Sequence, residues 1–155
     1  MQLYLSFKEI FSCFMVLFAI IDITGSIPIF IGLKSKGRSI NAVQASISSL
    51  IIGVVFLFLG EVILSLFGVD IQAFAVAGAL IILAMAVEMI FGVELFKNDG
   101  PSDSATIVPV IFPLIIGTGV MTTLLSLRAE YGILNIIIAF LINIIIVYIV
   151  LSQLD

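Results

Sequence analysis

Long apolar stretches separated by short polar connections run through almost the whole sequence. Runs without a single charged residue cover 39–60, 71–87, 104–127 and 131–154. A helix rises about 1.5 Å per residue, so about 20 residues cross the roughly 30 Å hydrocarbon layer of a bilayer. These four runs are therefore long enough, or nearly long enough, to span a membrane as helices.

A further apolar stretch, residues 10–33, carries one charge, Asp22, and we count it as a fifth span. The predicted spans are 8–32, 42–67, 71–91, 105–127 and 132–151, with short loops between them. In the second of these spans, small residues recur at helical spacing and favour close contact between helices. The pattern predicts an all-α fold, a polytopic transmembrane helix bundle.

Composition agrees with a membrane protein. Of the 155 residues, 63% are hydrophobic and 10% are charged, whereas a soluble domain is about half apolar and about a quarter charged. The single cysteine, Cys13, and the lack of histidine exclude an internal disulfide and histidine-dependent catalysis, and they argue against a zinc cluster. We expect no metal, no cofactor and no enzyme activity. The scattered charges, with a net charge of -4, indicate no nucleic-acid partner.

The basic residues predict an orientation in the cytoplasmic (inner) membrane. Lys34, Lys36 and Arg38 lie in the first loop, whereas residues 68–70 contain no basic residue. Because cytoplasmic loops are enriched in Lys and Arg, the first loop is expected inside and the N-terminus outside. Lys8 and Glu9 follow the first apolar residues, which argues against a cleaved signal peptide.

The first span carries a conspicuous polar interruption near its middle. The segment 21–28 reads Ile-Asp-Ile-Thr-Gly-Ser-Ile-Pro. Pro28 has no backbone N–H, so the carbonyl of Thr24 loses its helical partner, and Gly25 tolerates torsions that other residues resist. The sequence predicts an interrupted helix with free polar backbone here.

The fourth span repeats this pattern. Its segment 112–119 reads Phe-Pro-Leu-Ile-Ile-Gly-Thr-Gly, and it superimposes without a gap on 18–25, with Phe and Thr-Gly coinciding. This match suggests an internal repeat of three spans, in which the second copy enters the membrane from the opposite side, as in many secondary transporters. The alternative is a pair of structural kinks, since proline and glycine are common in membrane helices.

The two interruptions supply groups that could bind a zwitterion. The N-termini of half-helices offer N–H groups to an anion, and free carbonyls and a carboxylate receive an ammonium group. Asp22 is costly at bilayer depth, which favours a role in proton or substrate binding, or a role as the cap of the following half-helix. The predicted binding residues are Asp22, Thr24, Gly25, Ser26, Pro28, Pro113, Gly117, Thr118, Gly119, Thr122 and Thr123.

Other polar residues have competing explanations. Glu61 is a second candidate for proton or ion coupling, although it could also reach the membrane interface. Glu88 fits an interfacial position. Asn135 and Asn143 are better explained as hydrogen-bonding groups between helices than as ligands.

Several of these segments together resemble the MarC family of integral membrane proteins, which is related to a larger group of amino-acid exporters. The segment 22–28 resembles the family's Asp-Pro-x-Gly-x-x-Pro signature, with Ile23 in place of the first proline. Thr118 likewise stands where proline is usual. Further similarity covers 60–68, 74–78, 89–92 and 113–123, so the resemblance extends over nearly the whole chain.

This resemblance implies six spans in two inverted three-helix repeats, with the first and fourth helices broken. Five spans are visible, so we expect a first repeat at 1–91, a loop at 92–104 and a second repeat at 105–155 without its last helix. The implied function is secondary transport of small neutral amino acids or similar zwitterionic solutes, with lipid and a coupling proton or ion as partners. The alternative is a non-transporting scaffold or accessory subunit, or an inactive truncated family member.

Overall fold

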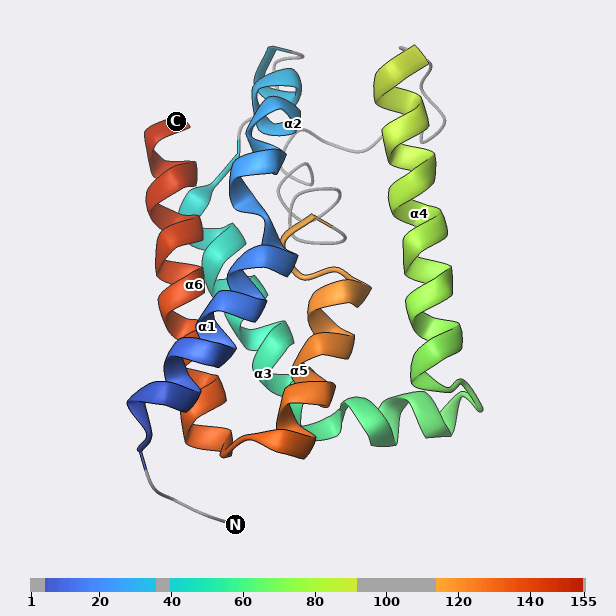
Figure 1. Cartoon of the computed structure of the whole chain (residues 1–155). Coiled ribbons are helices and arrows are strands. Elements are labelled where there is room, and N and C mark those ends of the chain that lie inside the picture. Colours follow the sequence, from blue (N-terminus) through green and yellow to red (C-terminus); the bar gives the residue numbers. More distant parts are fainter. Residues whose placement is uncertain (1–4, 36–39, 92–113, 155) are drawn as a thin grey trace.

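The computed structural model describes residues 5–35, 40–91 and 114–154 (Figure 1). These residues are almost entirely helical and contain no strand. The helices are α1 (Phe7–Ile21), α2 (Ile23–Ser35), α3 (Ala42–Leu66), α4 (Ile71–Phe91), α5 (Thr118–Glu130) and α6 (Ile133–Leu154). The prediction of an all-α helix bundle is confirmed.

Short polar side chains mark the ends of the helices. The Ser6 hydroxyl accepts a hydrogen bond from the Glu9 N–H at the start of α1, and the Asn41 amide oxygen accepts one from Gln44 N–H at the start of α3. The Asp70 carboxylate does the same for α4. Each bond satisfies an N–H that has no partner within the helix. Gly68 follows α3 with a φ of 65°, a left-handed conformation that suits glycine.

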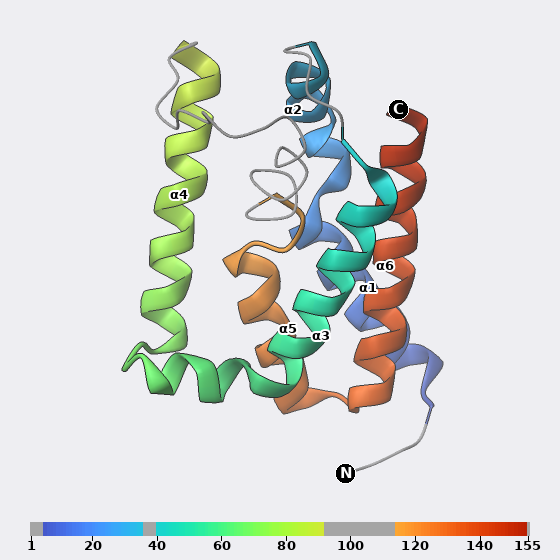
Figure 2. The same cartoon turned by 180° about the vertical axis from the view of Figure 1, so that it is seen from behind.

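The helices alternate in direction. In Figures 1 and 2, α1, α2, α4 and α6 run the same way, and α3 and α5 run the opposite way. The first helix lies beside the last, because Ser6 N–H donates to Asn135 Oδ1 near their starts and Asn143 Nδ2 donates to the Phe14 carbonyl further along. The start of α1 and the end of α6 therefore lie at opposite ends of the bundle.

The last part of α3 changes direction. It turns away from the bundle axis and crosses the base of the molecule to reach α4 (Figures 1 and 2). Arg128 of α5 donates from Nη1 to the carbonyl oxygens of Leu57 at 2.9 Å and Phe58 at 3.2 Å. Gly60 follows in the next turn, with its α-carbon facing Leu125. A glycine and a side chain that draws on helix carbonyls are both known causes of bending.

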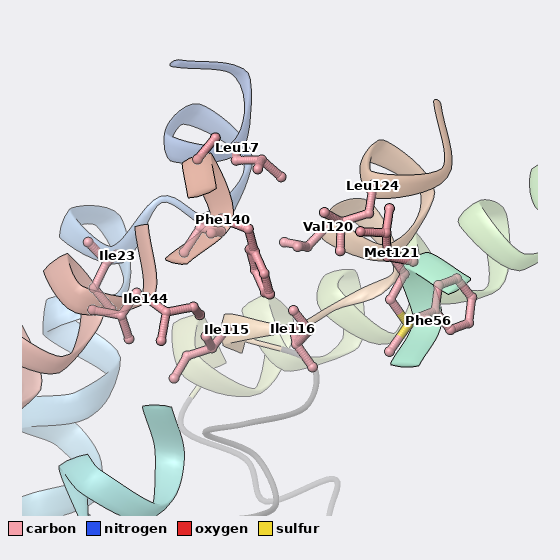
Figure 3. Close-up of a cluster of buried hydrophobic side chains, with 14 of the residues drawn as sticks. Leu17, Ile23, Phe56, Ile115, Ile116, Val120, Met121, Leu124, Phe140 and Ile144 are labelled. Carbon is pink, nitrogen blue, oxygen red and sulfur yellow. The ribbon is translucent and has the colours of Figure 1, made fainter. Parts of the chain in front are cut away.

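The core lies where α1, α3, α5 and α6 meet. Figure 3 shows the Phe140 ring pointing from α6 toward Ile116, with Leu17 nearby. Gly53 of α3 lets Phe140 and Ile116 come this close, because a Cβ at that position would collide with the ring. Between membrane helices such contacts act through close packing, since lipid is as apolar as the side chains.

Four of the five predicted spans agree with the observed helices to within a few residues. Three helical stretches are long and apolar enough to cross a membrane: Phe7–Ser35 with 29 residues, Ala42–Leu66 with 25 and Ile133–Leu154 with 22. The third predicted span, 71–91, coincides with α4. The fourth is represented by α5, while its first part, 105–113, lies outside the described residues.

Candidate functional site

The first span is broken at Asp22. Helix α1 ends at Ile21, α2 begins at Ile23, and Asp22 between them has φ 41° and ψ 54°. This left-handed conformation is uncommon outside glycine, and Asp and Asn are among the residues that tolerate it. The prediction of an interrupted first span is confirmed, with a single residue as the junction.

The location of the break differs from the prediction. Unwinding was expected around Gly25 and Pro28, but both lie inside α2, so that expectation is wrong. Pro28 removes one N–H donor without ending the helix. Membrane helices tolerate proline because neighbouring groups and local adjustment compensate for the lost bond.

The Asp22 side chain caps the helix that follows it. Its Oδ1 accepts hydrogen bonds from Gly25 N–H at 3.1 Å and from the Thr24 hydroxyl at 3.3 Å. The Asp22 carbonyl accepts from the Ser26 hydroxyl at 3.2 Å. The capping role considered from the sequence is therefore present, and the half-helix that Asp22 caps begins at Ile23.

Gly25 makes room for this cap. A Cβ on Gly25 would collide with the Asp22 carboxylate, most closely with Oδ2, so a side chain at this position would force the carboxylate to move. Both capping bonds end on Oδ1, and the Asp22 side chain is exposed. The other carboxylate oxygen, Oδ2, lies over the Gly25 α-carbon. It takes part in neither capping bond, so it can accept a hydrogen bond from an ammonium group.

The second break precedes α5. Gly117 is its N-cap, with extended torsions of φ -76° and ψ 175°, and no side chain caps the helix there. Gly117 and Thr118 are buried, so this helix start lies inside the protein. Gly119, the last residue of the matched segment 112–119, belongs to the first turn of α5, so the break lies two residues before it. The uncapped N–H groups and the helix dipole favour an anion at this end.

The two breaks lie beside each other. A Cβ placed on Gly119 would meet Ile20 Cγ2 at 3.4 Å, and Ile20 is two residues before Asp22. Ile20 and Gly119 thus lie where the end of α1 packs against the start of α5. The juxtaposition of the first and fourth spans at their interruptions, which the sequence match suggested, is present in the structure.

The remaining predicted site residues are distributed unevenly around this contact. Thr118 turns its side chain against Gly78 of α4. Thr122 donates its hydroxyl to the carbonyls of Thr118 at 2.8 Å and Gly119 at 3.1 Å. Thr123 is half-buried on α5. Pro113 lies outside the described residues.

The carboxylate of Glu61 stands apart from the breaks. Glu61 is exposed on α3, next to Gly60, which packs against Leu125 nearly two turns beyond the start of α5. The side chain of Glu88 lies outside the part of the chain whose side chains are described. Asp22 is thus the only one of the predicted acidic candidates placed at a break among the described side chains.

The two asparagines of α6 join helices, as predicted. Asn143 donates from Nδ2 to the Phe14 carbonyl at 3.2 Å and to the Ala139 carbonyl at 2.9 Å. Asn135 donates from Nδ2 to Glu9 Oε2 at 2.7 Å. The same carboxylate oxygen accepts from Gly132 N–H at 3.4 Å, where it also faces the positive end of α6.

Two basic residues were missed by the sequence analysis. Lys34 donates to the carbonyl of Leu154, and Arg128 donates to those of Leu57 and Phe58. Lys34 had been considered only as a marker of membrane orientation. The signal that could have found them is the gapless match itself, which places Lys34 on Arg128 when it is continued past Gly25.

Comparison with known proteins agrees with the resemblance found in the sequence. A sequence model of the MarC family integral membrane proteins matches residues 7–154. A UPF0056 membrane protein of Buchnera aphidicola subsp. Schizaphis graminum is 32% identical over 129 residues, 80% of this chain and 66% of the relative. The Escherichia coli K12 UPF0056 membrane protein YhcE is 30% identical over 155 residues, 92% of this chain and 72% of the relative.

The E. coli K12 UPF0056 inner membrane protein YhgN is 30% identical over 130 residues, which are 80% of this chain and 66% of the relative. The chain thus spans about two thirds of the length of these relatives. No solved structure matches it significantly.

Proposed function

Since this chain belongs to the MarC family of integral membrane proteins, we propose that it is a secondary transporter of small neutral amino acids or similar zwitterionic solutes. The observation that carries the proposal is the contact between two broken spans, with Ile20 against Gly119. Paired broken helices form the binding sites of many secondary transporters. The proposed location is the cytoplasmic membrane, which the description of the relative YhgN as an inner membrane protein supports.

The two breaks offer complementary charges to a zwitterion. At the first, Oδ2 of Asp22 can pair with the solute's ammonium group, because Oδ1 is engaged in capping α2. At the second, the N–H groups at the uncapped start of α5 can bind its carboxylate. Rocking of one repeat against the other would open this place to each side in turn.

Substitution of Asp22 can separate its proposed role in solute binding from its role as the cap of α2. Asn keeps an oxygen for the Gly25 N–H and tolerates the left-handed backbone, so Asp22→Asn should fold like the parent. It removes the charge, and loss of a charged hydrogen bond of about 1.5 to 3 kcal/mol predicts solute flux lower by about tenfold or more. Flux of radiolabelled alanine, serine and glycine in proteoliposomes measures this.

Two further variants complete the experiment. Asp22→Ala loses both charge and cap, so flux should fall and the midpoint of thermal unfolding in detergent should drop as well, whereas Asp22→Asn should leave that midpoint unchanged. Asp70→Asn makes the same chemical change at the cap of α4, away from the breaks, and should keep full flux. Parental flux in Asp22→Asn would refute the binding role, and a scaffold would show no solute flux at all.

A further inference from the structure

Two basic side chains tie the half-helices to their neighbours at opposite ends of the bundle. Lys34, in the last turn of α2, donates to the Leu154 carbonyl of α6. Arg128, in the last turn of α5, donates to the Leu57 and Phe58 carbonyls of α3. In Figure 1, α2 ends at the top of the molecule and α5 ends at its base.

The same sequence shift relates the two ties. The shift of 94 residues that superimposes 18–25 on 112–119 also places Lys34 on Arg128 and Asn41 on Asn135. It places the Asp22 break within one residue of the Gly117 break, and both helices that follow have 13 residues. Because Asn41 caps α3 and Asn135 lies in the first turn of α6, the helices that accept the two ties also correspond.

We propose that Lys34 and Arg128 are equivalent positioning residues, one in each repeat. Each holds the half-helix after a break against a helix of the other repeat, α2 on α6 and α5 on α3, and so keeps one end of the bundle closed. The breaks are short junctions, Asp22 in one span and Gly117 in the other, about which a half-helix can pivot. A tie in the last turn acts about 16 Å from the pivot, where it restrains that motion most.

The ties exist whether or not the protein transports solute, and only their consequence for flux rests on the proposed function. Closed ends that open alternately are what alternating access requires. Release of the Lys34 tie should free the end of α2 alone. Release of the Arg128 tie should free the end of α5 alone.

Spin-label distances test this directly, without added solute. In a Cys13→Ala background, one label pair at residues 35 and 153 reports the α2–α6 end. A second pair at residues 59 and 129 reports the α3–α5 end, and the shift of 94 residues relates the two pairs. All four positions are exposed, so the labels do not enter the core.

Lys34→Met should add a longer-distance population to the 35–153 pair and leave the 59–129 pair unchanged. Arg128→Met should do the reverse, and Lys34→Arg and Arg128→Lys, which keep a donor, should behave like the parent. Lys8→Met, which removes an exposed basic residue at the start of α1, should change neither pair. Lys34→Ala and Arg128→Ala, which also remove the donor, provide a second set of variants should a methionine variant fold poorly.

Unchanged distances in both Lys34→Met and Arg128→Met would overturn the proposal. So would an equal response of both pairs to either variant, because that result indicates general loosening of the bundle. Flux through the same variants forms a separate arm. If the distances respond as expected but the protein shows no solute flux, the role of the two ties is supported and the proposed transport function is refuted.

Discussion

At the scale of single residues, Asp22 combines three properties that the local fold needs. It ends α1 in a left-handed conformation, caps α2 through Oδ1 and keeps Oδ2 out of both capping hydrogen bonds. The sequence identified Asp22, Gly25 and Ser26 as members of one local unit. The sequence did not show where the helix breaks, because proline and glycine only make an interruption more common. The cap at Asp22 starts a new helix that continues through Gly25 and Pro28.

Gly78 offers the sharpest test of close packing. The Thr118 side chain fills the place that a Cβ on Gly78 would take, so Gly78→Ala must push α4 away from α5 or turn the threonine. Overpacking of this kind costs about 1 to 3 kcal/mol. We expect a lower unfolding midpoint for Gly78→Ala in detergent, measured by circular dichroism at 222 nm.

Gly32 provides the matched control. It lies within α2, and nothing lies within 4 Å of where its Cβ would be. Alanine is favoured over glycine in a helix by about 1 kcal/mol, so Gly32→Ala should be neutral or stabilising. Equal midpoints for both variants would contradict the packing at Gly78.

At the scale of elements, hydrogen bonds from α6 locate α1. Asn143 binds the Phe14 carbonyl in the middle of the pair, and Asn135 binds Glu9 at one end. Interhelical hydrogen bonds in membranes contribute on average about 0.6 kcal/mol, so Asn143→Leu should destabilise only slightly. Asn135→Leu leaves a partly buried carboxylate without its amide partner and should cost about 1 to 3 kcal/mol.

Unfolding of the two variants in parallel, by titration with a denaturing detergent, distinguishes these effects. The double variant Glu9→Leu/Asn135→Leu serves as control, because removing both side chains of this hydrogen bond is less costly than removing only one of them. A larger loss for Asn143→Leu than for Asn135→Leu would reverse the assignment.

The elements themselves were largely predictable. Runs of apolar residues determined where helices lie, and Gly68 and Asp70 marked the turn between α3 and α4. The bend at the end of α3 was not predictable, because it involves Arg128, 70 residues further along the chain. A sequence pattern reports local preference, whereas a bend of this kind depends on a distant partner.

At the scale of the whole molecule, the apolar pattern located the spans that the structure describes, but it did not predict which of them are neighbours. The short match between 18–25 and 112–119 correctly brought the first and fourth spans together. The same shift also pairs Lys34 with Arg128, a correspondence that was not among the predictions. The sequence match therefore predicted part of the arrangement of distant segments. Contacts such as that of Thr118 with Gly78 have no such signal, because they depend on packing alone.

The arrangement of the bundle also makes a prediction about sidedness. The start of α1 and the end of α6 lie at opposite ends (Figure 1), so residues 5 and 153 should lie on opposite sides of the membrane. The basic residues of the first loop assign the end of α6 to the cytoplasm, because α2 ends beside it through Lys34. In a Cys13→Ala background, Leu5→Cys should react with a membrane-impermeant maleimide in intact cells or spheroplasts, and Gln153→Cys only after lysis. Labelling of both in intact cells would contradict the bundle's span topology, and the reverse pattern would invert the orientation while leaving the fold intact.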